Sequence, residues 1–364
     1  RSEKPVDKKR KEKIAIACNV LMDNVISAPD IDSIYDVPGN FDNDKLGKII
    51  MKFFRLESRK GKGLNEWRRF AKGVKNFSEE VNIAIVGKYF NTGDFVLTDA
   101  YLSVLEAIKY SCYANKVKPK IHAINASDFE IANPDYSALD KYDGIIVPGG
   151  FGETGIEGKL NVIRYARENK IPFFGLCYGM QLMTIEFARN VLGLSSAHTA
   201  EIDPKSPHLI IDIMPDQKKK LADGNYGGSM RLGLYPAKLL KDSIAQKAYN
   251  SLSIKERHRH RYEVNPKYIE RLVKAGLVFS GKSPDGNLME IAELPRTLHP
   301  FFLGTQFHPE FLARPLCPHP LFTEFIKISK EEKKNRTRER LREALIEVKG
   351  RSEIIEQKEK ERVI

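Results

Sequence analysis

Between residues 81 and 177, short apolar runs alternate with segments of helical spacing, and this alternation constrains the fold more than any other feature. The apolar runs cover 81–87, 118–125, 142–150 and 171–177, and the helical segments cover 99–114 and 158–169. Strand-like runs separated by helices indicate βαβ units. We therefore predict an α/β fold with a doubly wound, mostly parallel sheet. Ligands then belong at the carboxyl ends of the strands.

The two ends of the chain differ from this central part. Residues 14–20 have the composition of a strand, a helix is expected near 45–54, and 57–76 is predicted to be a polar linker with a helical middle. The last segment, 329–364, is highly charged, with apolar residues at helical spacing. A solvated helix is predicted there, and a helix that binds a partner is the alternative.

The bulk composition excludes several classes of protein. The formal net charge of +12 would suit an anionic partner, but the basic residues concentrate at the two ends, so we expect no nucleic-acid partner. No run approaches the roughly 20 apolar residues of a membrane span. The four cysteines lack CxxC spacing, which indicates neither a zinc site nor a disulfide framework. We expect no metal site and a cytoplasmic protein with reduced thiols.

One cysteine stands where an α/β enzyme places a nucleophile. The stretch PFFGLCYGMQ, 172–181, is a predicted strand followed by Gly175, Cys177 and Gly179 and then by a predicted helix. This is the thiol version of the G-x-S-x-G nucleophile elbow, in which small neighbours leave room for a sharp turn. The dipole of the following helix favours a thiolate. A structural cysteine buried in a core is the alternative.

A base for this thiol is predicted in QFHPEF, 306–311. His308 follows an apolar run, and Glu310 lies two residues further on, close enough to orient the imidazole if the chain turns at Pro309. A histidine beside a proline is otherwise an ordinary turn residue. Together, Cys177, His308 and Glu310 provide a nucleophile, a base and an orienting carboxylate.

Two further motifs are compatible with acyl transfer. The glycines of VPGGFG, 147–152, end the third strand and are predicted to direct backbone amides toward an oxyanion. In RHRHRYE, 257–263, an extended chain would place the arginines on one face and the histidines on the other. Such arginines could bind a carboxylate or a phosphate, whereas a solvated basic edge strand is the alternative.

Taken together and in this order, these motifs resemble the CTP synthase family. VPGGFG, GLCYGMQ, GGSMRLG (227–233), RHRHRYEVNP and QFHPEF carry the resemblance in the second part of the chain. KIAIACNV and VISAPDIDSIYDVP resemble the end of that family's synthetase domain. The resemblance implies a class-I glutaminase fold, which is flavodoxin-like, with a strand–cysteine–helix nucleophile elbow. It implies a C-terminal remnant of the synthetase (amidoligase) domain over 1–56, a linker over 57–80, the glutaminase domain over 81–328 and a charged helical tail over 329–364.

The resemblance also implies roles for individual residues. Cys177 would attack the side-chain amide of L-glutamine to form a thioester, His308 would act as base and then acid, and Glu310 would orient it. The residues implied in glutamine binding are Gly150, Tyr178, Gly179, Met180, Gln181, Glu201 and Arg261. Gly150 and the backbone after Cys177 would support the oxyanion. The residues that match nucleotide contacts of the synthetase domain are Lys13, Pro29, Asp30 and Ile31.

In the intact family enzyme, the ammonia aminates UTP to CTP with ATP and Mg²⁺, and GTP activates glutamine hydrolysis. The glutaminase reaction itself needs no cofactor. The resemblance implies a synthetase domain or subunit as partner and a homo-oligomer of the intact enzyme. The phosphate loop and magnesium ligands of that synthetase domain are absent from this sequence, so the chain alone is not expected to make CTP.

The sequence departs from the family pattern near the predicted site. Thr154 stands where the family usually has Arg, Tyr178 replaces the usual Leu, and AHTAE (197–201) replaces the usual residues before Glu201. A catalytically weak or inactive module for binding or assembly is therefore one alternative function. A class-I glutaminase that serves guanine nucleotide synthesis is another, although residues 13–38 favour the CTP synthase resemblance.

Overall fold

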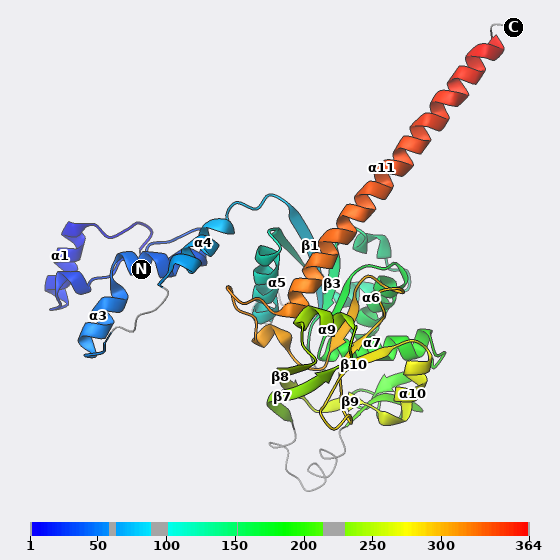
Figure 1. Ribbon diagram of the computed structural model, residues 1–364, viewed down its shortest axis with the longest axis horizontal. Coiled ribbons are helices and arrows are strands. Elements are labelled where there is room, and N and C mark those ends of the chain that lie inside the picture. Colours follow the sequence, from blue (N-terminus) through cyan, green and yellow to red (C-terminus); the bar gives the residue numbers. More distant parts are fainter. Residues whose placement is uncertain (1, 58–62, 89–100, 151, 214–229, 363–364) are drawn as a thin grey trace. The chain divides into compact units, whose positions relative to one another are not determined.

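The computed structural model describes residues 2–57, 63–88, 101–150, 152–213 and 230–362. It forms two compact units, Arg1–Ser78 and Glu79–Ile364, which are described separately (Figure 1).

The first unit is helical in its described part. Its helices are α1 (Lys8–Ala17), α2 (Val37–Asn43), α3 (Leu46–Phe53) and α4 (Asn65–Gly73). The helix expected near 45–54 and the helical middle of the linker are therefore present. The rings of Tyr35, Trp67 and Phe70 pack together, with centroids 5.1–6.3 Å apart, and the Trp67 indole donates to the Tyr35 carbonyl at 2.7 Å. This aromatic cluster joins α4 to the segment before α2.

The strand predicted over residues 14–20 is wrong, because α1 continues through Ala17. The side chain of Asp7 caps this helix by accepting from the backbone N–H of Arg10 at 2.8 Å. The following run KKRKEK consists of good helix formers and carries the helix into the apolar residues. The described residues of this unit also contain no strand that could pair with a strand at 14–20.

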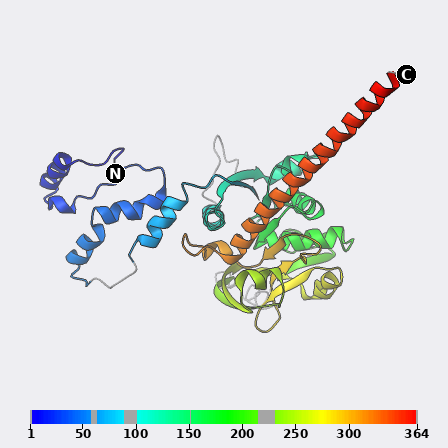
Figure 2. The same cartoon turned by 45° about the horizontal axis from the view of Figure 1, so that its top comes forward.

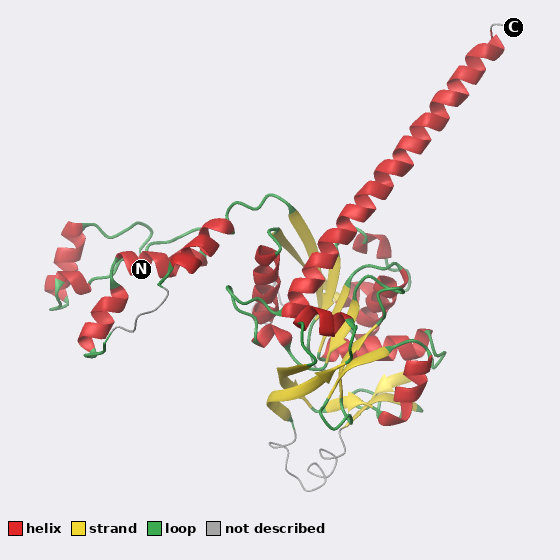
Figure 3. Ribbon diagram, in the orientation of Figure 1, coloured by secondary structure: helices red, strands yellow, loops and turns green. Residues whose placement is uncertain are grey.

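The second unit is built on a mixed sheet (Figure 3). Among the described residues, nine strands follow the order β2-β1-β3-β4-β12-β11-β10-β7-β8, and a second sheet contains β5-β6-β9. The strands are β1 (Glu80–Gly87), β2 (Lys118–Asn125), β3 (Gly144–Val147), β4 (Phe173–Leu176), β5 (Ala197–Thr199), β6 (His208–Ile213), β7 (Arg231–Leu239), β8 (Ser253–His260), β9 (Tyr262–Val264), β10 (Val278–Lys282), β11 (Met289–Glu293) and β12 (Phe302–Thr305). The first five strands of the large sheet are parallel and the other four pair antiparallel.

Helices cover both faces of this sheet, as predicted for a doubly wound fold. They are α5 (Leu102–Ala114), α6 (Ile156–Glu168), α7 (Tyr178–Asn190), α9 (Ile244–Tyr249), α10 (Pro266–Lys274) and α11 (Pro320–Arg362). Ala84 and Val86 of β1 face the core under α6, α7 and α10, whereas Ile83 and Ile85 face the core under α5, α9 and α11. The predicted α/β class is confirmed, and residues 99 and 100 of the expected helix lie outside the described residues.

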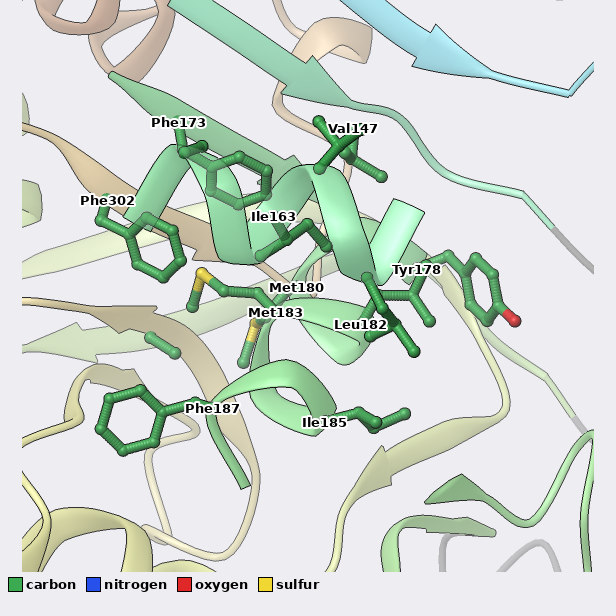
Figure 4. Close-up of a cluster of buried hydrophobic side chains, with 14 of the residues drawn as sticks. Val147, Ile163, Phe173, Tyr178, Met180, Leu182, Met183, Ile185, Phe187 and Phe302 are labelled. Atoms are coloured by element: carbon green, nitrogen blue, oxygen red, sulfur yellow. The ribbon is translucent and has the colours of Figure 1, made fainter. Parts of the chain in front are cut away.

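Helix α7 lies at the centre of the first core. Figure 4 shows Met180, Met183 and Phe187 of this helix near Phe173 and Phe302 of the adjacent strands. Every residue from Tyr178 to Ala188 is buried. Because a helix buried on all sides cannot shift without disturbing the core, its first residue holds a fixed position at the end of β4.

The last helix begins within the core and not at the charged tail. Phe322 and Phe325 of α11 are fully buried, and Asp143 pairs with Lys333 at 3.2 Å and Arg336 at 2.9 Å. Figures 1 and 2 show the helix continuing past the sheet. In the described parts of the chain, no helix is both long enough and apolar enough to cross a bilayer.

Candidate active site

Cys177 lies at a strained turn between β4 and α7. Its φ of 50° and ψ of −98° are unfavourable for a residue with a Cβ, and its backbone N–H donates to the Thr305 carbonyl at 2.6 Å. The neighbouring parallel strand therefore fixes the turn from one side. This is the strand–cysteine–helix elbow predicted from the sequence.

The glycines on each side of Cys177 are required by close backbone contacts. A Cβ on Gly175 would lie 2.7 Å from backbone atoms of Gly179, and a Cβ on Gly179 would lie 2.1 Å from the Val147 carbonyl oxygen. A larger residue at either position would separate α7 from the sheet. The motif is therefore a packing requirement of this turn.

His308 and Glu310 lie beside the thiol. The ring Nδ1 of His308 is 2.7 Å from Oε1 of Glu310, and the His308 backbone N–H donates to the Arg257 carbonyl at 2.8 Å. The Phe311 ring stacks on the imidazole, with centroids 4.8 Å apart and planes 13° apart. A carboxylate can only accept, so Nδ1 carries a hydrogen and the other ring nitrogen is left for Cys177.

The electrostatic surroundings favour a protonated imidazole. Burial by itself would lower the pKa of His308, but the negative charges of Cys177 and Glu310 and hydrogen bonds to both residues raise this pKa well above its ordinary value. An imidazolium beside a cysteine stabilises the thiolate, which is the reactive form.

A glycine turn borders the thiol on the side of β3. A Cβ on Gly149 would lie 2.8 Å from Cε1 of His308, whereas a Cβ on Gly150 would meet no atom within 4 Å. The backbone at Gly149 therefore passes directly beside the side chains of His308 and Cys177. Residue 151 of VPGGFG lies outside the described residues.

A cavity of about 330 Å³ opens at the thiol. The residues that line it are Gly150, Cys177, Tyr178, Gln181, Glu201, Met230, Arg259, His260, Arg261 and Tyr262. The structure thus brings together Cys177 and five of the residues implied in glutamine binding.

Opposite charges face this cavity. One carboxylate oxygen of Glu201 accepts from the backbone N–H of Gly152 at 3.3 Å. Burial raises the pKa of Glu201, while Gly152, Lys88 and Arg261 oppose that rise. The buried Nε of Arg261 and the buried hydroxyl of Tyr178 have no hydrogen-bond partner among the described residues. Buried polar atoms without partners in a cavity are suited to a polar ligand.

Two of the residues implied in glutamine binding lie outside the cavity wall. Gly179 and Met180 are absent from the cavity lining. The Met180 side chain packs in the core, and its backbone N–H donates to the Cys177 carbonyl at 3.1 Å. The reason is the helix direction, which turns these two residues toward β3 and the core. Both residues help to shape the elbow, and their implied role in glutamine binding stays a prediction.

The residues that match nucleotide contacts lie in the first unit. Lys13 is exposed on α1, and Pro29 forms a bridge with Ser2. Asp30 donates its backbone N–H to the Ser2 carbonyl at 3.0 Å, and Ile31 follows it. Thr154 is exposed in the turn before α6, and residues 227–229 of GGSMRLG lie outside the described residues.

The alternation predicted for RHRHRYE is present up to residue 260. In the edge strand β8, Arg257 and Arg259 are exposed, and His258 and His260 are buried. Burial lowers the pKa of His258 to about 2 and that of His260 to about 3, and nearby positive charges act in the same direction. Both histidines are therefore neutral and are part of the interior.

These histidines form a buried polar ladder, which also includes Glu290 and Arg231. Nδ1 of His260 is 3.0 Å from the Tyr262 carbonyl oxygen, and Nδ1 of His258 is 3.1 Å from Nε2 of His260. The carbonyl oxygen can only accept, so each Nδ1 carries a hydrogen and Nε2 of His258 is left as an acceptor. That atom faces Oε2 of Glu290 at 3.5 Å, and Oε1 of Glu290 accepts from Arg231 at 2.7 Å. Burial raises the pKa of Glu290 to about 7, against the effect of Arg231.

The contacts of the Cys177 sulfur atom were not predicted from the sequence. In its protonated form the Cys177 thiol can donate to the Arg259 carbonyl at 3.8 Å, and Nε2 of Gln306 donates to the sulfur at 3.7 Å. The available signal for Gln306 was its place two residues before His308, directly after an apolar strand. Within the described ranges, no three His, Cys, Asp or Glu side chains form a cluster that could hold a metal ion.

Comparisons with known proteins agree with this geometry. Residues 96–328 match the model of the glutamine amidotransferase class-I family, and residues 1–56 match the CTP synthase N-terminus. The solved structure of the Trypanosoma brucei CTPS glutaminase domain with bound acivicin is 39% identical, with a TM-score of 0.63, and covers 69% of this chain and 94% of that chain. The fold and the site thus define a class-I glutamine amidotransferase.

The curated relatives show to which family within this class the chain belongs. CTP synthase of Halalkalibacterium halodurans is 50% identical over 329 residues, which are 90% of this chain and 60% of the relative. CTP synthase of Pyrococcus furiosus is 47% identical over 337 residues, which are 92% of this chain and 60% of the relative. The chain belongs to the CTP synthase family, and it spans about 60% of the length of these curated relatives. The resemblance to the CTP synthase family that the motifs indicated is therefore confirmed.

Proposed function

We propose that this chain hydrolyses L-glutamine to glutamate and ammonia through a thioester on Cys177. The observation that carries the proposal is the strained Cys177 turn beside a buried His308, which is bonded to Glu310 at 2.7 Å. The cavity beside the thiol, with Glu201 and Arg261 in its wall, provides charges for the ammonium and carboxylate groups of an amino acid.

In the first half-reaction, the Cys177 thiolate attacks the carbonyl carbon of the glutamine side-chain amide. The negative oxygen of the tetrahedral intermediate is placed near the backbone amides of Gly150 and Tyr178. Tyr178 is the first residue of α7, so its N–H has no acceptor within the helix. His308 gives its proton to the leaving nitrogen, the C–N bond breaks, and ammonia and a glutamyl thioester result.

In the second half-reaction, His308 removes a proton from water and the hydroxide adds to the thioester carbonyl. The C–S bond then breaks, which releases glutamate and returns the thiolate beside the protonated imidazole. Glu310 holds the ring in one tautomer through both steps. No cofactor enters either half-reaction.

We further propose that the ammonia serves the amination of UTP to CTP in the intact enzyme, with ATP and Mg²⁺ as co-reactants and GTP as activator. The relatives named CTP synthase support this proposal. In it, the partner is a synthetase domain or subunit, the intact enzyme is a homo-oligomer, and this chain alone supplies ammonia without making CTP. We place the reaction in the cytoplasm, which the four free thiols support.

Ammonia release from L-glutamine tests the proposed hydrolysis. The wild-type chain is expected to release ammonia, and Cys177→Ala is expected to abolish the release. His308→Ala is expected to lower kcat by about 10²–10⁴-fold. Release that persists in Cys177→Ala would contradict the mechanism. A wild-type chain that binds partners but releases no ammonia would favour the alternative of a binding or assembly module.

A further inference from the structure

Gln306 contacts the sulfur of Cys177 from the interior. It follows β12 directly, is fully buried, and donates from Nε2 to Sγ at 3.7 Å. Its backbone is held in place, because its N–H donates to the Glu290 carbonyl at 2.8 Å. The amide group therefore has little freedom to leave the sulfur.

The orientation of this amide is fixed by a chain of hydrogen bonds. Nε2 of Gln181 is 3.2 Å from the Tyr262 carbonyl oxygen and 3.3 Å from Oε1 of Gln306. The Tyr262 oxygen can only accept, so the Gln181 atom that faces it must be the NH₂ group. That NH₂ group must in turn face the oxygen of Gln306, which leaves the NH₂ group of Gln306 toward the sulfur.

The two polar neighbours of the sulfur favour different protonation states. The Arg259 carbonyl, at 3.8 Å, accepts only from a protonated thiol. The N–H of Gln306 can bond a thiolate more strongly than a thiol, because a hydrogen bond to an ionised acceptor is stronger than one to a neutral acceptor. An amide on this side therefore complements the imidazolium of His308 on the other side.

We propose that Gln306 is a further catalytic residue, whose amide N–H stabilises the Cys177 thiolate, and that Gln181 is a positioning residue that keeps this amide correctly oriented. The inference rests on the proposed nucleophilic role of Cys177. Gln181, which was predicted to bind glutamine and lines the cavity, directs its NH₂ group toward the Tyr262 carbonyl and Gln306.

Several titratable or charged side chains line the cavity, form the His308–Glu310 pair or belong to the buried polar ladder, and they must remain unchanged in the test. They are His308, Glu310, His258, His260, Glu290, Arg231, Glu201 and Arg261. The substitutions therefore change only uncharged amides, apart from one deliberate change to a carboxylate.

The test is the rate of Cys177 alkylation by iodoacetamide as a function of pH, read by peptide mass spectrometry so that the exposed Cys18 and Cys317 do not interfere. Gln306→Met removes the donor at similar volume. Its alkylation profile is expected to move to higher pH by about one to two units, given the usual strength of a hydrogen bond to a charged group. Gln306→Glu should move it at least as far, because a carboxylate then faces the sulfur.

Matched variants separate this effect from a loss of structure. Gln246→Met makes the same exchange on α9, away from the thiol, and should leave the profile unchanged. Gln181→Met should shift the profile in the same direction but less, because Gln306 keeps its NH₂ group but loses the partner that orients it. Gln306→Asn retains an amide but withdraws it from the sulfur by one methylene, so it should also shift the profile. This variant replaces Gln306→Met as the test if Gln306→Met fails to fold.

An unchanged profile in a folded Gln306→Met or Gln306→Asn chain would overturn the inference. Alkylation requires no glutamine, so the result is independent of the proposed hydrolysis. A shifted profile in a chain that releases no ammonia would contradict the proposed function and leave the role of Gln306 intact. Ammonia release together with an unshifted profile would support the proposed function and contradict the role of Gln306.

Discussion

The parallel and antiparallel halves of the large sheet contribute to the site in different ways. The parallel half supplies Cys177 through close backbone packing, in which Gly175 and Gly179 leave no room for a Cβ. The antiparallel half supplies the buried polar ladder of β8, which ends at Glu290 and Arg231. His308 follows β12, the strand at which the two halves meet.

This difference indicates how each half should respond to substitution. A site formed by backbone contact is sensitive to added volume and insensitive to charge. A site formed by buried polar side chains is sensitive to the loss of one partner, because the remaining group is left buried without compensation. Variants in each half can therefore test the comparison.

The largest effect is expected from Gly179→Ala in the parallel half. The new Cβ would lie 2.1 Å from the Val147 carbonyl oxygen, so α7 or β3 must move. We expect a loss of about 5 kcal/mol or more in the free energy of unfolding, measured by urea denaturation. Gly150→Ala is the control for stability, because its Cβ meets no atom within 4 Å. Equal stability of the two variants would refute the packing explanation.

The next effect is expected from Glu290→Leu in the antiparallel half. This change leaves Arg231, whose side chain is 10% exposed, without its carboxylate, and leaves His258 Nε2 facing an apolar group. The expected loss in the free energy of unfolding is about 3–5 kcal/mol. Glu270→Leu, at an exposed ion pair with Lys274, should change it by less than about 1 kcal/mol. Comparable losses of unfolding free energy in both variants would show that the buried ladder contributes no more to stability than an exposed ion pair does.

The parallel half also contains a buried charge, on Lys159 of α6. Lys159 is 2% exposed, its Nζ lies 5.6 Å from the Tyr178 ring centroid, and burial lowers its pKa to about 8, from about 10.5. Because the unfolded chain binds this proton more tightly, Lys159 destabilises the fold below pH 8, and this cost disappears as the pH rises to about 10.5. Lys159→Met should therefore be more stable than wild type at pH 7, by at most about 3 kcal/mol, and the difference should shrink by pH 9.5. Urea denaturation at the two pH values measures this difference in the free energy of unfolding. A difference that grows with pH would contradict the assignment.

The smallest effect is expected from Tyr178→Phe. The hydroxyl is buried without a partner among the described residues and lies in the wall of the cavity. If it bonds the substrate, its removal should raise KM for glutamine about 3- to 10-fold and change kcat less than about 2-fold. Steady-state ammonia release measures both constants. A large fall in kcat with unchanged KM would instead place Tyr178 in the chemical step.

The parallel half could be predicted from the sequence because its signals are local. Each apolar run is one strand, and the glycines beside Cys177 mark the elbow directly. The pairing of His308 with Glu310 was also accessible, because the two residues are close in sequence. These inferences need only periodicity and turn chemistry.

The contacts of the antiparallel half could not be predicted in the same way. The alternation in RHRHR indicates two faces, but not that the histidines are buried near Glu290, 32 residues further along the chain. The donation from Gln306 to Cys177 joins residues 129 positions apart. The strand predicted at 14–20 failed because helix capping by Asp7 outweighed a short apolar run.

Labelling with acivicin, which is bound in the trypanosomal glutaminase domain, tests directly whether Cys177 is the nucleophile of a glutamine site. We expect one adduct per chain, located on Cys177 by peptide mass spectrometry, absent in Cys177→Ala and formed more slowly in His308→Ala. Excess L-glutamine should protect the wild-type chain. Labelling on other cysteines only, or equal labelling with and without glutamine, would contradict the assignment of Cys177 as the nucleophile of a glutamine site.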